Sequence, residues 1–183
     1  MNKRNDAAEA VPGPSRRQII SRLAIATFGS VATGAMSWGK TAQAMVEPPS
    51  AGADKLRTSL HQEVDLPAGP HRIYAPLLDS KQFAAFSGAA ATIDPAPGGA
   101  FSMFGGQITG RNVELVPDQR IVQAWRPGSW SPGVYSIAKF ELAAMGSRTR
   151  VILDHTGFPE GKFAGLDSGW HERYWERLKK FFS

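Results

Sequence analysis

The sequence of 183 residues predicts one α+β domain in which a curved antiparallel sheet packs against a long C-terminal helix. Two observations lead to this fold class. Residues 90–156 have the alternating apolar pattern of strands and are divided by short turns rich in glycine and proline. The chain then ends in a segment with one apolar stripe at helical spacing, formed by Trp170, Tyr174, Leu178 and Phe181. Packing this stripe on the sheet would bury both apolar surfaces.

The domain is expected to begin with a strand and two short helices. Ser59–Leu66 alternates between two faces, which predicts a strand with one side on the core. Pro70 suits the first turn of a helix that Pro76 should interrupt or end. A second short helix should follow, with Asp79 or Ser80 as its N-cap.

A run of strands and a final helix complete the predicted fold. The strands expected after the two short helices are Phe101–Phe104, Gln107–Val116, Arg120–Arg126, Val134–Ala144 and Arg148–Thr156. Short connections between consecutive strands favour an antiparallel meander. In the last strand His155 falls on the apolar face, so its side chain should point toward the core. The terminal helix is expected over 167–182, with Asp167 or Ser168 as its N-cap.

The first 44 residues have the order of parts found in an export signal. Arg16 and Arg17 precede a weakly apolar stretch, Leu23–Gly39, and small residues lead to a predicted cleavage site after Ala44. The paired arginines resemble the twin-arginine signal of bacteria, which predicts the twin-arginine export machinery as a partner and a periplasmic or secreted protein. The alternative is an uncleaved signal that anchors the protein in the inner membrane, because the stretch is near the length that spans a bilayer.

Charge divides the chain at the same place. The first 44 residues hold six basic and two acidic side chains, whereas the remaining 139 hold 15 basic and 14 acidic ones. Residues 45–55 are interpreted as a linker and residues 56–183 as the folded domain, with no membrane span left after cleavage. A nearly neutral domain lacks the basic surface that neutralises phosphates, so we expect no nucleic-acid partner.

The sequence lacks the motifs of common catalytic and metal sites. It has no cysteine, which excludes disulfides, thiolate zinc ligands and cysteine nucleophiles. Its four histidines have no metal-ligand spacing, and its glycines match neither a phosphate-binding nor a dinucleotide-binding pattern. No Gly-x-Ser-x-Gly segment is present. We therefore predict no metal and no cofactor, assign no catalytic residue, and favour a protein that is not an enzyme.

Aromatic residues concentrate in the second half of the chain and predict either a filled core or a lined cavity. In the second case His155 and Tyr174 would be the few polar groups that orient a guest molecule. The candidate ligand-binding residues are Phe104, Trp125, Trp130, Tyr135, His155, Trp170 and Tyr174.

Several segments together resemble one known family. Phe104–Gly110, Arg120–Arg126, Asp154–Pro159 and Gly169–Trp175 occur in the order found in the activator of heat-shock-protein-90 ATPase homologue family. The resemblance covers roughly residues 60–182 and implies the helix-grip fold of START-like proteins, which holds an apolar cavity between the sheet and the long helix. Family members that stimulate the chaperone's ATPase carry a further N-terminal domain, where this chain has the predicted export signal. We therefore do not expect chaperone ATPase activation.

These observations leave three hypotheses for function. The first is an exported protein that binds or carries a small apolar or aromatic molecule. The second is an enzyme of the cyclase or hydrolase kind that uses His155 as a general base in the same cavity. The third is a protein-interaction module that uses the exposed face of the sheet and has a filled interior.

Overall fold

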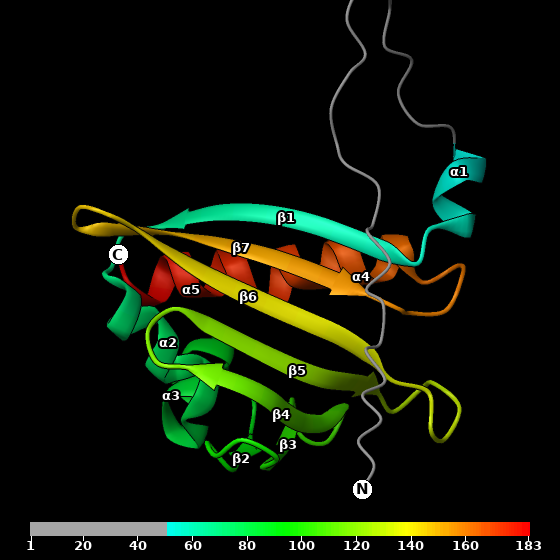
Figure 1. Cartoon of the computed structure of the whole chain (residues 1–183), viewed down its shortest axis with the longest axis horizontal. Coiled ribbons are helices and arrows are strands. Elements are labelled where there is room, and N and C mark those ends of the chain that lie inside the picture. Colours follow the sequence, from blue (N-terminus) through cyan, green and yellow to red (C-terminus); the bar gives the residue numbers. More distant parts are fainter. Residues whose placement is uncertain (1–50) are drawn as a thin grey trace, which may run out of the picture. The chain divides into compact units, whose positions relative to one another are not determined.

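The computed structural model describes residues 51–183 and contains one seven-stranded antiparallel sheet with helices against it (Figure 1). The strand order is β1-β7-β6-β5-β4-β3-β2, so the first strand of the domain pairs with the last one. This arrangement, with a long C-terminal helix across the sheet, is the predicted helix-grip α+β fold. The predicted signal, including Arg16, Arg17 and the cleavage site after Ala44, lies outside the described residues, as does most of the predicted linker.

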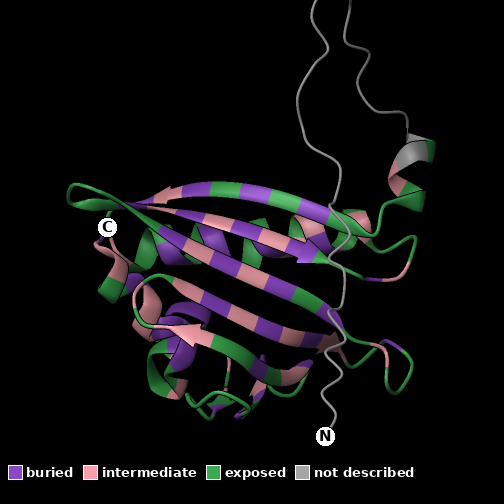
Figure 2. Cartoon of the chain, in the orientation of Figure 1, coloured by how far each residue is buried: buried purple, intermediate pink, exposed green. Residues whose placement is uncertain are grey.

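The domain starts with a short helix and the edge strand of the sheet. α1 (Ala51–Leu56) occupies the end of the segment expected to be a linker. β1 (Ser59–Leu66) pairs along its whole length with β7, and its buried residues alternate with exposed or half-buried ones as predicted (Figure 2). The inward-facing polar member of this strand, Gln62, accepts a hydrogen bond from Nε1 of Trp175 at 2.5 Å. Gln62 thereby joins β1 to the C-terminal helix.

Two short helices follow β1, as expected. α2 (Pro70–Leu78) starts at Pro70 and continues two residues beyond Pro76, so the prediction that Pro76 interrupts or ends the helix was wrong by part of a turn. The missing N–H of Pro76 falls in the last turn, where the helix is about to end in any case. Asp79 then caps α3 (Ser80–Ser87), because its carboxylate accepts a 2.8 Å hydrogen bond from the Gln82 N–H.

The remaining strands form the predicted meander. They are β2 (Thr92–Ile93), β3 (Ala100–Met103), β4 (Ile108–Val116), β5 (Arg120–Pro127), β6 (Ser136–Met145) and β7 (Arg148–Thr156), each antiparallel to the next. The two-residue strand β2 was not predicted. The pairing of β4 with β5 shifts between Asn112 and Glu114, which leaves Val113 in a bulge and 54% exposed.

The C-terminal helix begins earlier than expected and changes its type along its length. It consists of α4 (Phe163–Trp170), a π-helical segment η1 (His171–Trp175) and α5 (Glu176–Phe181). The predicted N-cap at Asp167 or Ser168 is wrong, because the helix starts four residues before Asp167. Instead of capping, the Asp167 side chain accepts a 2.7 Å hydrogen bond from Nε2 of Gln62.

The core lies between the inner face of the sheet and the helices (Figure 2). Inward residues of β1, β5, β6 and β7 meet the C-terminal helix. α2 contacts β6 and β7, and α3 packs against α5. The most deeply buried large side chains include Phe83, Phe140, Leu153, Phe158 and Trp170. Over residues 51–183, no helix combines the length and the apolar character needed to cross a membrane.

Candidate functional site

A cleft opens where the C-terminal helix passes β4, β5 and the loop after β5. Its volume is about 610 Å³, which lies within the range of small-molecule sites. The apolar part of its lining is formed by Phe104, Ile108, Trp125, Trp130, Leu166, Trp170 and Tyr174. Each of these side chains is less than one-tenth exposed, so the wall of the cleft is also part of the core.

β5 and the loop that follows it supply two tryptophans of this wall. The alternation of β5 turns Trp125 inward. Trp130 lies in the next loop, where Arg126 donates hydrogen bonds to the carbonyl oxygens of Trp130, at 2.8 Å, and Ser131, at 3.2 Å. The two indoles meet edge to face with their centroids 6.2 Å apart. The loop is therefore tied to the strand and holds Trp130 in place.

The C-terminal helix supplies a second set of aromatic side chains, at and within its π-helical segment. The i→i+5 bonds of a π-helix widen the turn beyond the 3.6 residues of an α-helix. Trp170 and Trp175 therefore stack, with ring planes 20° apart and centroids separated by 5.9 Å. Tyr174 lies 4.4 Å from Trp170, centroid to centroid. The predicted α-helical stripe included Phe181, which is 39% exposed, and left Trp175, which is buried, beside the stripe.

Two glycines of α4 form the smooth side of the cleft. Gly165 and Gly169 both line it and are one helical turn apart, so they lie on the same face of the helix. A Cβ atom built at either position would meet no atom within 4 Å. The helix backbone therefore borders the cleft directly at these two positions, and larger side chains there would fill the cleft. Glycine also weakens a helix, so its presence twice on this face has a cost in stability.

His155 lies behind the aromatic wall. It is fully buried on β7, as predicted, and is packed edge to face against the rings of Trp125 and Trp170. Nε1 of Trp170 donates a 3.0 Å hydrogen bond to Nδ1 of His155. Nε2 of His155 is 2.6 Å from Oγ of Ser136, which in turn donates to the carbonyl oxygen of Trp125 at 3.1 Å. Both ring nitrogens therefore have partners.

These bonds define the protonation state of His155. Because an indole N–H is a donor only, Nδ1 must accept, and the neutral ring carries its proton on Nε2. That proton is donated to Ser136, whose own proton goes to the backbone. Burial lowers the pKa of His155 to about 3, so the ring is neutral near pH 7. The histidine has no free lone pair with which to act as a base.

The structure brings most of the predicted cavity residues together. Phe104, Trp125, Trp130, Trp170 and Tyr174 line the cleft. His155 does not line it, because Trp125 and Trp170 lie between the ring and the open space. Tyr135 does not belong to this group: it precedes β6, is 49% exposed, and is not part of the cleft. Tyr135 was predicted to line a cavity only because it is aromatic. It lies just before β6, whose pairing starts at Ser136, so the sheet does not turn its side chain inward.

The sequence reasoning missed the glycine face and the polar rim. Gly165 and Gly169 were visible as a pair at helical spacing, which would have been a usable signal had the helix been predicted to start at Phe163. The polar residues at the rim are Gln107, Ser129, Lys162, Ser168, Glu172 and Arg173. Three of them come from the helix, and the others come from loops whose course no periodicity describes. Within the described part of the chain, no group of three or more histidine or acidic side chains is placed to hold a metal ion.

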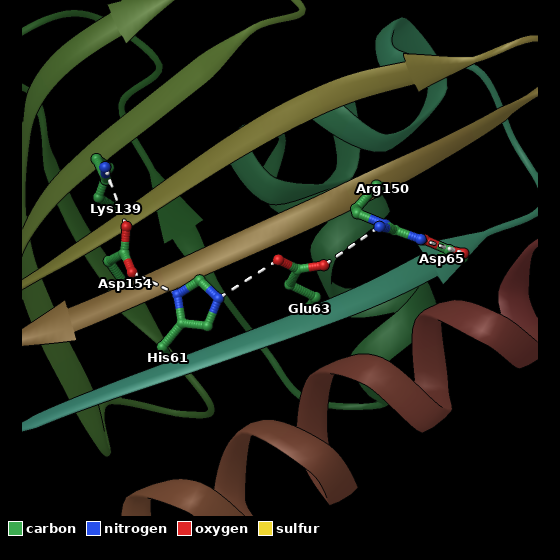
Figure 3. Close-up of polar contacts among 6 residues, drawn as sticks. All are labelled: His61, Glu63, Asp65, Lys139, Arg150 and Asp154. Carbon is green, nitrogen blue, oxygen red and sulfur yellow. Dashed lines mark hydrogen bonds and ion pairs between the residues drawn. The ribbon is translucent and has the colours of Figure 1, made fainter. Parts of the chain in front are cut away.

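The opposite face of the sheet carries a ladder of ion pairs instead of an apolar surface. Figure 3 shows it crossing β1, β7 and β6. Its contacts join Lys139 to Asp154 (3.0 Å), Asp154 to His61 (2.7 Å), His61 to Glu63 (3.5 Å), Glu63 to Arg150 (3.4 Å) and Arg150 to Asp65 (2.8 Å). The hydrogen bond with Asp154 raises the pKa of His61 above its ordinary value of 6.5. The charges of this face are thus matched with one another.

The fold and the cleft define a helix-grip protein with an aromatic site under its long helix. Residues 67–183 match the family described as "Activator of Hsp90 ATPase homolog 1-like protein". Because the match covers more than half of the chain, the protein belongs to this family. The resemblance seen in the sequence is confirmed at this level.

Individual relatives agree with the family assignment. The chain is 32% identical over 126 residues to an activator of 90 kDa heat shock protein ATPase homolog from Dictyostelium discoideum, a match over 68% of this chain and 33% of that protein. It is 28% identical over 113 residues to the human activator homolog 1, over 62% of this chain and 33% of the relative. The chain therefore spans about a third of the length of these two relatives.

A solved structure shows the same fold. The crystal structure of an HSP90 activator from Plasmodium falciparum matches 68% of this chain and 96% of its own chain, with a TM-score of 0.65 and 22% identity.

Proposed function

We propose that the domain binds a small apolar or aromatic molecule in the aromatic cleft and acts as a binding or carrier protein. The observation that supports this function is the cleft of about 610 Å³ lined by five aromatic side chains from β5, the C-terminal helix and the loops between strands. Pockets of this volume, with an apolar lining and few polar groups, are typical of small-molecule sites. The bare helix face at Gly165 and Gly169 keeps the space open.

The geometry favours binding over catalysis. A general base must present a free lone pair to the proton that it removes. His155 has both nitrogens engaged and is separated from the cleft by Trp125 and Trp170. Ser136 is bound as a donor to a backbone carbonyl, so it is not activated as a nucleophile. The cyclase or hydrolase hypothesis therefore lacks its proposed base.

The experiment that tests binding uses a neutral fluorescent probe, N-phenyl-naphthylamine, with two variants of one residue. Gly169→Leu should fill the cleft and abolish the fluorescence increase, whereas Gly169→Ala adds only one methyl group in open space and should keep it. Native mass spectrometry of the purified protein, followed by denaturing extraction, would identify a natural molecule that co-purifies. Equal probe binding by both variants, or no binding by the unaltered protein, would contradict the proposal.

We also propose export through the twin-arginine pathway, with cleavage after Ala44 and a periplasmic or secreted mature protein. The proposal rests on the sequence pattern at Arg16 and Arg17 and on the small residues before the cleavage site. Replacing both arginines by lysine should leave the full-length protein in the cytoplasm. The mature protein from the periplasm should begin at Met45 by mass; a membrane-bound protein that retains residues 1–44 would instead support the anchor.

The names of the relatives suggest a different partner. Those proteins are called activators of a 90 kDa heat shock protein ATPase, and this chain corresponds to about a third of their length. Adding the domain 56–183 to that chaperone and measuring ATP hydrolysis tests whether the activity extends to this chain. We expect no stimulation, and an increase would favour the chaperone-related function over small-molecule binding.

A further inference from the structure

We propose that the molecule bound in the cleft is a flat aromatic compound that carries an anionic oxygen group, such as an aromatic carboxylate. This inference rests on the proposed binding function and adds the chemical class of the ligand. It is carried by the shape of the cleft, by the hydrogen-bonding character of its lining and by the charges at its rim.

The shape of the cleft fits a flat molecule. On one side the helix presents only its backbone, at Gly165 and Gly169. A Cβ atom at either position would have no neighbouring atom within 4 Å. The rings of Trp125, Trp130 and Tyr174 also line the cleft. Aromatic rings pack on one another at centroid distances of roughly 4.5–7 Å, so a planar guest can contact these rings while its other face lies on the glycine surface. A saturated ring would lack this contact between aromatic rings.

The buried polar groups of the lining are donors in need of acceptors. Nε1 of Trp125 is buried and has no hydrogen-bond partner among residues 51–183. The hydroxyl of Tyr174 donates only a long contact, 3.9 Å, to the sulfur of Met103, which is a weak acceptor. Both side chains line the cleft and are 4% exposed. A buried donor without an oxygen partner is unfavourable, so a ligand oxygen would be favoured here.

The rim adds positive charge. Lys162 and Arg173 line the cleft, and within the described residues neither forms an ion pair. Arg173 is held over the opening by neutral partners: it donates a 3.0 Å hydrogen bond to Oε1 of Gln107 and lies 5.8 Å from the ring centroid of Phe104. Glu172 is the one carboxylate of the lining. Two cations against one anion favour a negatively charged guest.

The ligand class is tested with three probes of nearly equal size and binding measured by quenching of tryptophan fluorescence. Naphthoate is flat and anionic, naphthamide is flat and neutral, and decahydronaphthoate is anionic but saturated and puckered. Naphthoate should bind about tenfold more tightly than each of the other two, because each lacks one of the features that the cleft recognises. Its affinity should fall as salt rises, whereas that of naphthamide should not.

Two variants test whether Arg173 and Tyr174 contact the anionic group of the ligand. Arg173→Gln should weaken naphthoate about tenfold and leave naphthamide unchanged, since it removes the charge and retains a polar side chain. Tyr174→Phe should weaken both probes, because it removes the hydroxyl donor and keeps the ring. Lys179→Gln, on the same helix but outside the cleft, is the control and should leave both affinities unchanged.

The outcomes separate the two proposals. Binding of N-phenyl-naphthylamine that Gly169→Leu abolishes, together with equal affinities for naphthoate and naphthamide, would overturn the anionic class while keeping the binding function. Tight binding of decahydronaphthoate would overturn the flat class in the same way. If none of the four probes binds, the proposed function itself fails.

Discussion

The indole nitrogen of Trp170 donates a 3.0 Å hydrogen bond to Nδ1 of His155, so a residue of the C-terminal helix fixes the tautomer of a histidine on β7. The contact links the helix to the sheet inside the core, directly behind the cleft. It also makes the histidine a structural group, because its second nitrogen is engaged by Ser136.

His155 should make the domain less stable in mild acid. Burial lowers its pKa in the folded state to about 3, against an ordinary value of 6.5. The unfolded chain therefore binds a proton that the folded chain rejects, and stability falls as pH drops from 6.5 toward 3, by about 1.4 kcal/mol for each pH unit. Denaturant unfolding at a series of pH values measures this slope. His155→Asn should reduce the slope, and an unchanged slope in that variant would show that another group is responsible.

Trp170→Phe should destabilise the domain by about 2–4 kcal/mol, because it leaves Nδ1 of His155 without a donor and removes part of a buried ring. Tyr174→Phe is the matched control, since the hydroxyl that it removes contacts only sulfur and the loss should stay within about 0.5 kcal/mol. Chemical denaturation of both variants measures the difference. Equal losses would mean that the hydrogen bond contributes little.

His61 on the outer face should titrate above 6.5, because its hydrogen bond with Asp154 favours the protonated ring. The same bond lowers the pKa of Asp154 below its ordinary value of 3.8. The contribution of His61 to stability is thus complete below pH 6.5 and is lost as pH rises through its raised pKa, while that of Asp154 is lost as pH falls below 3.8. Titration of the ring protons by nuclear magnetic resonance should show the His61 pKa falling in Asp154→Asn, and an unchanged His61 pKa in that variant would contradict the assigned cause.

Gly110→Ala should destabilise the sheet by about 1–3 kcal/mol. A Cβ atom at this position of β4 would overlap the carbonyl oxygen of Ala124 and the ring of Phe101, and the backbone oxygen cannot move aside. Gly165→Ala, where the space is open, should be neutral or stabilise α4 by up to about 1 kcal/mol. Thermal unfolding of both variants distinguishes them. A loss in Gly165→Ala comparable to that in Gly110→Ala would contradict the description of the cleft.

Alternation along strands was the most reliable signal in the sequence. It predicted β1 and β7 with their bounds and placed His155 on the inner face. The helix start was less predictable, because Asp167 looked like an N-cap while its carboxylate is engaged by Gln62, a residue 105 positions away. Such a contact leaves no trace in local sequence.

The candidate site could be predicted in its aromatic wall but not in its opening. Large aromatic residues on inward positions of β5 and on the helix are visible as a pattern, and Trp125, Trp170 and Tyr174 indeed meet. Whether these rings leave an open cleft depends on the other residues that line it. The cleft stays open because Gly165 and Gly169 have no side chains and because the loop after β5 holds Trp130 at its edge. Neither feature produces a periodic pattern in the sequence.

The π-helical segment has a consequence for how the helix can change. If the same residues formed a continuous α-helix over 163–181, α4 would be rotated by roughly 100° relative to α5, because the π-helical turn in η1 (His171–Trp175) takes up about one residue more than an α-helical turn. Gly165 and Gly169 would then turn away from the cleft while Leu178 stayed buried. The extra residue therefore lets α5 keep Leu178 packed in the core while α4 keeps its two glycines facing the cleft.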